Sequence, residues 1–134
     1  MKSNSILVID NDVEYLTFVM DFLTIEMKLN QVAWAVSSKD AENKINTFNP
    51  DIVILDLGMK ETEKLSSLIK NKPVVPVLLI TTYYSNEDYN NLVIGMGADG
   101  FFLKDEVKTA LPKLMKFFNT DFYDRLRKNL YIMN

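Results

Sequence analysis

The sequence of 134 residues contains no cysteine and no histidine. Without cysteine the chain cannot form a disulfide bond or a thiolate metal site. Without histidine it has no imidazole ligand and no histidine general base or nucleophile. Any metal must therefore be held by oxygen atoms, which favours Mg²⁺, Mn²⁺ or Ca²⁺.

The sequence also lacks a long apolar run. Residues 1–5 lead into only four apolar residues, Ile6–Ile9, which is too short for the core of a signal peptide, and no stretch approaches the length of a membrane span. We therefore expect a cytoplasmic protein that has no contact with a membrane. The formal net charge of -3 gives no general attraction to nucleic acid, and the basic residues after Lys104 are interpreted as a solvated helix face.

Short runs of Val, Ile and Leu alternate with segments of helical period. Four-residue runs of this kind indicate strands buried on both faces, as in a parallel sheet. The predicted strands are Ser5–Asp10, Gln31–Val36, Asp51–Asp56, Val77–Thr81 and Phe101–Leu103. Five strands alternating with five helices predict an α/β domain whose parallel sheet is covered by helices on both faces.

The helices are predicted between these strands from apolar spacing and capping residues. They run from about Asp12 to Lys28, from a cap at Ser37 or Ser38 through Asn46, over Glu61–Asn71, from a cap at Asn86 to Gly95, and from about Thr109 to Phe118, with Pro112 in the first turn. One domain is expected over residues 1–119. Residues 120–134 are interpreted as a helical extension or a linker.

The first predicted helix carries two apolar stripes. One stripe is expected to face the sheet and consists of Leu16, Met20, Leu23 and Met27. The second consists of Tyr15, Phe18, Phe22, Ile25 and Leu29. Two interpretations of the second stripe stay open: it contacts a partner or a second copy of the chain, or flanking loops and the C-terminal tail cover it.

Acidic residues stand at the ends of two predicted strands. Asp10 and Asp12 follow the first apolar run, and Asp56 closes the run Ile52–Leu55. In a parallel sheet these ends lie at one edge, which is where open α/β sheets bind ligands. Like charges gathered there repel one another, and a bound cation would relieve the repulsion. The sequence therefore predicts a cation-assisted site centred on these acids.

Four segments, each at the end of a predicted strand, resemble the receiver domain of two-component response regulators. They are Ile6–Asp12, Asp51–Met59, Pro76–Thr82 and Gly97–Lys104, and the resemblance extends over about residues 5–118. It implies a flavodoxin-like, doubly wound fold with strand order 2-1-3-4-5. It also implies a signalling module in a phosphorelay, and not an enzyme.

The resemblance implies a phosphoacceptor and a metal site. Asp56 would be phosphorylated, and Asp10 and Asn11 occupy the positions of the acidic pair that holds Mg²⁺ in the family. Asp56 would share the ion with them, and Gly58 would offer its backbone carbonyl. Phosphoryl transfer to a carboxylate needs positioning and charge neutralisation more than covalent work by the protein, so these residue types suit the chemistry.

Three further residues have implied roles. Thr81 would hydrogen-bond the phosphoryl group, Lys104 would pair with it, and Phe101 takes the place of the aromatic residue that switches with Thr81. Receivers couple this movement to a change of the surface formed by the fourth helix, fifth strand and fifth helix. The phosphodonor would be a histidine kinase or a phosphotransfer protein. The output would be a downstream protein or a fused domain, with a homodimer as a further possibility.

The sequence departs from the family at two places. The first is Asn11, which replaces an acid. Two interpretations stay open: Asn11 mainly caps the first helix, in a capping box with Glu14, or it also contacts the metal. Asp12 could restore the missing negative charge. The segment between Asp56 and Thr81 is several residues short. The rival hypothesis is therefore a pseudo-receiver, an interaction or dimerisation module that works without phosphorylation. A flavodoxin-like enzyme is disfavoured, because no phosphate-cradling glycine loop follows the first strand.

Overall fold

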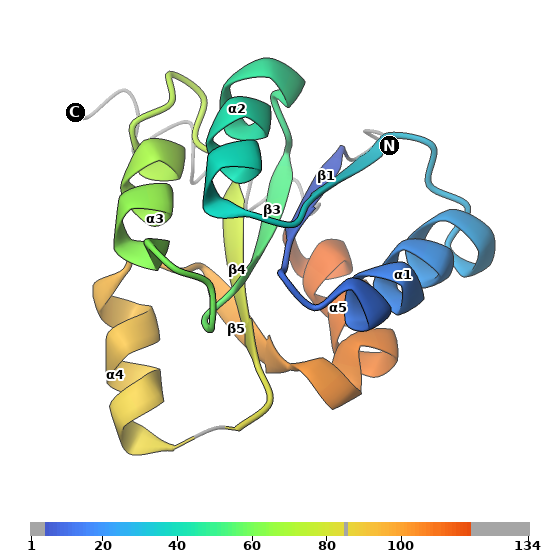
Figure 1. Cartoon of the computed structure of the whole chain (residues 1–134). Coiled ribbons are helices and arrows are strands. Elements are labelled where there is room, and N and C mark those ends of the chain that lie inside the picture. Colours follow the sequence, from blue (N-terminus) through green and yellow to red (C-terminus); the bar gives the residue numbers. More distant parts are fainter. Residues whose placement is uncertain (1–4, 85, 119–134) are drawn as a thin grey trace.

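The structure is a computed structural model that describes residues 5–84 and 86–118. A central parallel sheet is covered by helices on both faces (Figure 1). The strands are β1 (Ile6–Ile9), β2 (Val32–Ala35), β3 (Ile52–Asp56), β4 (Val77–Thr82) and β5 (Gly100–Leu103). The α-helices are α1 (Val13–Asp21), α2 (Ser38–Phe48), α3 (Thr62–Lys70), α4 (Glu87–Gly95) and α5 (Val107–Phe118).

The strands are arranged in the order β2-β1-β3-β4-β5, and all four neighbouring pairs are parallel. This is the predicted doubly wound, flavodoxin-like sheet, so the expected fold is confirmed. The strands β1 and β3, which both lie inside the sheet, are buried along their whole length, as the unbroken apolar runs predicted. Among the described residues, no helix combines the length and the apolar character needed to cross a membrane.

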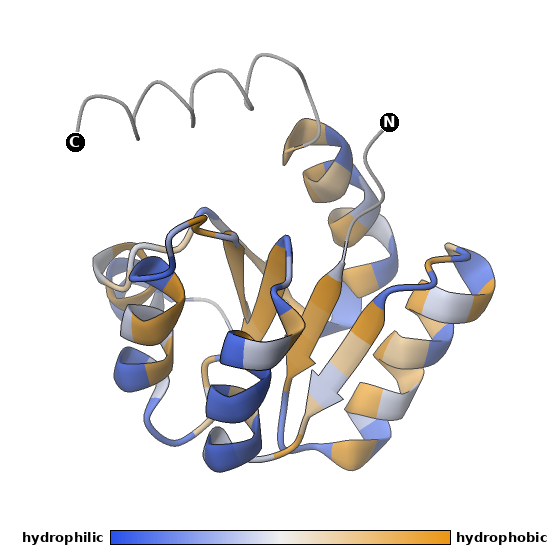
Figure 2. Cartoon of the chain, turned by 90° about the horizontal axis from the view of Figure 1, so that it is seen from above, coloured by the Kyte–Doolittle hydropathy of each residue, from blue (hydrophilic) through white to orange (hydrophobic). Residues whose placement is uncertain are grey.

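Alternate side chains of the strands supply two separate cores. Ile6, Val8, Ile52 and Ile54 pack with residues of α1 and α5 on one face. Leu7, Ile9, Val53 and Leu55 pack with residues of α2, α3 and α4 on the other. Figure 2 shows the apolar strands between the two helical layers, and polar residues on the outer sides of the helices. A residue two positions beyond a core residue therefore lies on the same face of the sheet.

The first helix departs from the predicted regular spacing. After Asp21 the chain forms a π-turn over Phe22–Glu26, in which the Met27 N–H donates to the Phe22 carbonyl (2.9 Å). The wider turn inserts an extra residue into the helical repeat, so that Phe22 and Leu23 are both buried. The α-helix therefore ends at Asp21 and not at Lys28.

Most of the second apolar stripe is not exposed at the surface. Phe22 is buried, and Tyr15 and Leu29 are partly buried against the core. Only Phe18 and Ile25 remain exposed. The Lys108 ammonium of α5 lies 5.2 Å from the centre of the Phe18 ring. Three of the five members of the second stripe therefore pack against the core, and its exposed members are two separate side chains.

The helix starts confirm two predicted caps and correct two other details. Ser37 caps α2 and Asn86 caps α4 through their side-chain oxygens. The cap of α1 is Asp12 and not Asn11. A 3₁₀ turn over Lys104–Glu106 leads directly into α5, which begins two residues earlier than predicted. Pro112 is consequently the sixth residue of α5 and lies beyond the first turn.

A lysine of α2 occupies a backbone acceptor at the outer edge of β2. The Lys44 ammonium of α2 donates a hydrogen bond to the Trp34 carbonyl and lies 5.5 Å from the centre of the Trp34 indole. It also pairs with Asp40 one turn earlier in α2 (3.2 Å). A backbone acceptor on this edge strand is thus occupied by a charged side chain.

Candidate functional site

Four predicted site residues lie at the carboxyl edge of the sheet and on one of its faces. Each stands two positions beyond a residue of the core shared with α1 and α5: Asp10 after Val8, Asp56 after Ile54, Thr81 after Leu79 and Lys104 after Phe102. The register places Asp56 opposite Thr81 on β4, and Leu55 opposite Ile9 on β1. Strand order and pleat therefore bring four distant segments of the chain together.

Lys104 lies between two carboxylates. Its ammonium nitrogen is 2.7 Å from Asp10 Oδ2 and 3.3 Å from Asp56 Oδ2. All three side chains are at least nine-tenths buried. Burying a charge is costly unless it is paired, and here one cation is shared by two anions. The cluster therefore keeps a net negative charge of one.

The environment changes the pKa values of the buried pair. Burial raises the pKa of Asp10, and the hydrogen bonds from Lys104 and from the Asp12 N–H oppose that rise without cancelling it. Burial acts to lower the pKa of Lys104, but the hydrogen bond to Asp10 and the charges of Asp10 and Asp56 outweigh it, so that the pKa rises. Lys104 is therefore held firmly in its charged form.

Asp12, in the loop after β1, has a structural role. The Asp12 N–H donates to Asp10 Oδ1 (2.9 Å), and Asp12 Oδ1 accepts from the Tyr15 N–H (3.2 Å) as the helix cap. The prediction that Asn11 caps this helix is therefore wrong. Asn11 is exposed beside the site, where its amide oxygen is free of that capping role.

Gly58 contacts the predicted phosphoacceptor through its backbone. Its N–H donates to Asp56 Oδ1 (3.1 Å), while Lys104 contacts the other carboxylate oxygen. A Cβ atom at Gly58 would lie 3.5 Å from both carboxylate oxygens. The absence of a side chain at residue 58 therefore leaves the approach to Asp56 open.

Two tyrosines at this site were not predicted as site residues. The Tyr15 hydroxyl donates to the Lys104 carbonyl (3.0 Å), and the Tyr83 hydroxyl donates to Asp12 Oδ2 (3.2 Å). Both rings face the Lys104 ammonium, each with its centre 4.8 Å from the nitrogen. Burial, followed by nearby acidic groups, raises the pKa of Tyr15. The available sequence signal was spacing, since Tyr83 stands two positions after Thr81.

The predicted switch residues differ in exposure. Thr81 is buried next to Asp56. Phe101 is 42% exposed, while its neighbour Phe102 belongs to the core shared with α1 and α5. Because side chains alternate along a strand, Phe101 lies on the opposite face of the sheet, the face that carries α4.

The donor set suits Mg²⁺. The carboxylates of Asp10 and Asp56 come from neighbouring strands, and Asn11 and Gly58 offer neutral oxygen atoms close by. Within residues 5–84 and 86–118, no group of three or more acidic side chains is placed to hold a metal. Mg²⁺ does not require one, because it is usually bound through one or two carboxylates and keeps several waters. The residues therefore fit the ion, although with few charged ligands.

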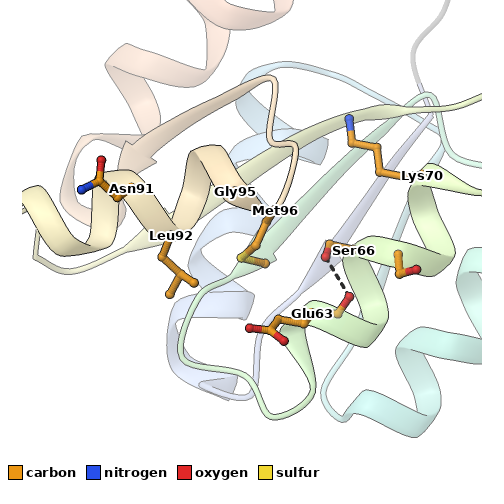
Figure 3. A pocket seen from close by; sticks show the side chains of 8 residues that line it. Glu63, Ser66, Lys70, Asn91, Leu92, Gly95 and Met96 are labelled. Carbon is orange, nitrogen blue, oxygen red and sulfur yellow. Dashed lines mark hydrogen bonds between the residues drawn. The ribbon is translucent and has the colours of Figure 1, made fainter.

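A separate cleft lies between α3 and α4 (Figure 3). Its volume is about 510 Å³, and its lining includes Glu63, Ser66, Lys70, Leu92 and Met96. The Ser66 hydroxyl donates to the Glu63 carbonyl (2.9 Å) and is thereby satisfied within its own helix. None of the predicted site residues lines this cleft. The neighbouring helix α4 is sparsely packed, since Val93 is the only buried residue of that helix.

Comparison with known proteins gives a consistent result for the family. The model of the response regulator receiver domain matches residues 6–116. The transcriptional regulatory protein DegU of Brevibacillus brevis is 28% identical over 114 residues, which are 83% of this chain and 48% of that protein. Protein-glutamate methylesterase/protein-glutamine glutaminase 1 of Methanospirillum hungatei JF-1 is 31% identical over 103 residues, or 74% of this chain and 30% of that protein.

A solved structure agrees in fold. The CheY-like response regulator receiver domain protein from Methanospirillum hungatei JF-1 superposes with a TM-score of 0.74 at 19% identity, over 96% of this chain and 99% of that chain. The chain spans less than half the length of the two curated relatives, so their further regions have no counterpart in the match. Because the family model accounts for residues 6–116, the chain belongs to the response regulator receiver domains.

Proposed function

We propose that this receiver accepts a phosphoryl group on Asp56 from a phosphohistidine of a histidine kinase or phosphotransfer protein, and that it then changes a protein-binding surface. The observation that carries the proposal is the shared ammonium: Lys104 lies 2.7 Å from Asp10 and 3.3 Å from Asp56 at the edge of the sheet. A buried carboxylate beside a fixed cation suits attack on a phosphorus atom, because negative charge on the phosphoryl group must be neutralised.

In the proposed reaction a carboxylate oxygen of Asp56 attacks phosphorus. A new P–O bond forms as the P–N bond of the donor breaks, and the released imidazole nitrogen takes the electron pair and then a proton from water. Lys104 pairs with the phosphoryl oxygens, and the Gly58 N–H and the Thr81 hydroxyl donate hydrogen bonds to them. Mg²⁺, held by Asp10, Asp56, Asn11 and the Gly58 carbonyl, would supply further charge neutralisation when bound.

Phosphorylation would then bias two existing conformations. The phosphoryl group adds about -1.5 to -2 charge, which draws Thr81 and Lys104 toward it. As Thr81 moves, Phe101 would leave its exposed position and fill space near α4. The sparse packing of α4, with Val93 as its only buried residue, supports a low energetic cost for this rearrangement.

The partners and the location are part of the same proposal. The downstream target is a protein or a fused output domain, as the longer relatives suggest, and the chain forms a homodimer in one of its states. Direct contact with nucleic acid or with a membrane is not expected. The chain itself is proposed to be a signalling module and not an enzyme, and the cytoplasmic location stays a prediction from the sequence.

The test is to incubate the folded protein with Mg²⁺ and a small phosphodonor such as acetyl phosphate, and to measure the intact mass. We expect one phosphoryl adduct in the wild-type protein and none in Asp56→Asn. Asp105→Asn is the matched control, because Asp105 is an exposed acid next to Lys104, and it should keep the adduct. An adduct that persists in Asp56→Asn would move the acceptor to another residue.

The rival pseudo-receiver has one observation in its favour. Both carboxylate oxygens of Asp12 accept hydrogen bonds, from the Tyr15 N–H and from the Tyr83 hydroxyl, which disfavours Asp12 as a metal ligand in place of the acid missing at Asn11. Under that hypothesis, wild-type protein at millimolar Mg²⁺ would form no adduct and would show no amide shifts with beryllofluoride. The proposed phosphorylation would then be rejected, while the fold and the family would stand.

A further inference from the structure

Two aromatic rings lie against the charged end of Lys104. Tyr15 comes from the first turn of α1, and Tyr83 follows the end of β4. The two ring centres are 6.3 Å apart with the ring planes at 65°, and each centre is 4.8 Å from the ammonium nitrogen. Such separations fall within the range of cation–π attraction. The nitrogen is thus contacted by two carboxylates and by two rings.

Both rings are held in place from the hydroxyl end. The Tyr15 hydroxyl donates to the backbone carbonyl of Lys104 (3.0 Å), and the Tyr83 hydroxyl donates to Asp12 Oδ2 (3.2 Å). Asp12 is itself fixed as the cap of α1. The tyrosines therefore connect the loop after β4, the start of α1 and the end of β5, three segments that are far apart in the sequence.

A lysine side chain is a flexible stem with a compact charge, and holding it in one conformation costs rotational freedom. In most positions that freedom lets the ammonium sample several partners. Here the carboxylates attract the nitrogen from one side, and the ring faces limit its movement on another. The ring faces can do this without hydrogen bonds, so the ammonium keeps its donors for oxygen atoms.

We propose that Tyr15 and Tyr83 are positioning residues that clamp the Lys104 ammonium between Asp10 and Asp56. The ring faces carry this role, and the hydroxyls only orient the rings. The consequence for phosphorylation depends on the proposed function of Asp56: a clamped ammonium is already in place when the phosphoryl group arrives, so less of its freedom is lost during transfer.

The first experiment tests, in metal-free protein, whether the two rings lie against the Lys104 side chain. The side-chain CεH₂ signal of Lys104 is recorded by NMR on protein with ¹³C-labelled lysine, and it is assigned from the spectrum of Lys104→Met. Two ring faces should move this signal to low chemical shift. We expect Tyr83→Leu to lose much of that shift and Tyr83→Phe to keep it. An unchanged signal in Tyr83→Leu would overturn the proposal.

The second experiment reads the consequence as the rate of phosphorylation by acetyl phosphate with Mg²⁺. Tyr83→Leu should lower the rate about threefold or more, in line with the strength of a cation–π contact, whereas Tyr83→Phe should restore it. In a Lys104→Met background, Tyr83→Leu should have no further effect. A further loss in that background would show that Tyr83 acts by another route, and the clamp would be rejected.

Tyr84→Leu is the matched control, since Tyr84 is 75% exposed and adjacent to Tyr83. It should change neither the NMR signal nor the rate. The two experiments separate this proposal from the proposed function. If wild-type protein forms no adduct on Asp56, the function fails, yet the NMR experiment still decides whether the rings hold Lys104.

Discussion

At the scale of single residues, the site places two carboxylates and one ammonium group where little water reaches them. Asp10 is 1% exposed and Lys104 3% exposed. Pairing recovers part of the cost of burying these charges, but the remainder is a loss of stability that the fold carries. Titratable groups with strongly changed environments are concentrated at functional sites, which supports the proposal that Asp56 is phosphorylated in this cluster.

The first prediction concerns Asp10. Burial raises its pKa above the ordinary value of 3.8, so the folded protein binds this proton more readily than the unfolded chain does. Stability therefore falls as the pH rises from about 3.8 through the raised pKa, and the loss persists at neutral pH. We expect Asp10→Asn to have a higher free energy of unfolding at pH 7, with the gain disappearing below pH 3.8.

Urea unfolding at several pH values measures this difference. Asp105→Asn serves as the control, because Asp105 is exposed and its substitution should change the free energy of unfolding little at any pH. A lower stability of Asp10→Asn at pH 7 would mean that the attraction between Asp10 and Lys104 outweighs the cost of burial.

At the scale of helices and strands, the clustering of Asp10, Asp56, Thr81 and Lys104 could be predicted, because each stands at the end of a strand with an apolar pattern. The register of a parallel sheet then brought Asp10, Asp56 and Thr81 together without further information. Lys104 could be placed because β5 ends immediately before it.

Details decided by contacts between distant segments could not be predicted. The choice between Asn11 and Asp12 as helix cap depends on a single residue of register, and both types cap helices well. The Tyr83–Asp12 hydrogen bond joins residues 71 positions apart. The π-turn at Phe22 follows from burying Phe22 and Leu23 together, which a fixed 3.6-residue period does not describe.

The second prediction tests the cap of α1. Asp12→Ala removes the acceptor of the Tyr15 N–H and should lower the free energy of unfolding by about 1 kcal/mol. It also releases the Tyr83 hydroxyl, but the proposed clamp depends on the ring face, so the rate of Asp56 phosphorylation should stay close to that of the wild-type protein. Thermal or urea unfolding and the acetyl phosphate assay measure the two effects.

Ser37→Ala is the matched control for this prediction. Ser37 caps α2 in the same manner, accepting from the Asp40 N–H (3.1 Å). It should lose a similar amount of stability while leaving the phosphorylation rate unchanged. A slower rate in Asp12→Ala but not in Ser37→Ala would mean that the Tyr83–Asp12 hydrogen bond, and not only the ring face, contributes to the clamp.

At the scale of the whole molecule, the fold consists of two cores separated by one sheet. The core shared with α1 and α5 extends to Phe118, and the other core extends from Leu7 to Met96. In the part of the chain that the structure describes, the residues of both cores lie within residues 6–118. The tail after residue 119, which was predicted as an extension or linker, lies outside the described residues.

The third prediction follows from this division. A chain that ends at Asn119 should fold and should keep the free energy of unfolding to within about 1 kcal/mol, because it retains every residue described in the two cores. Urea unfolding measures this, and light scattering on both forms tests the homodimer. A large loss of stability would show that residues 120–134 belong to the domain.

The position of Lys44 at the edge of β2 affects whether copies of this protein associate at high concentration. With a positive charge seated on the Trp34 carbonyl, a second chain cannot lengthen the sheet there without first displacing that charge. Substituting Lys44 would leave the Trp34 carbonyl at the edge of β2 without this hydrogen bond. We would then expect copies of the protein to self-associate through β2.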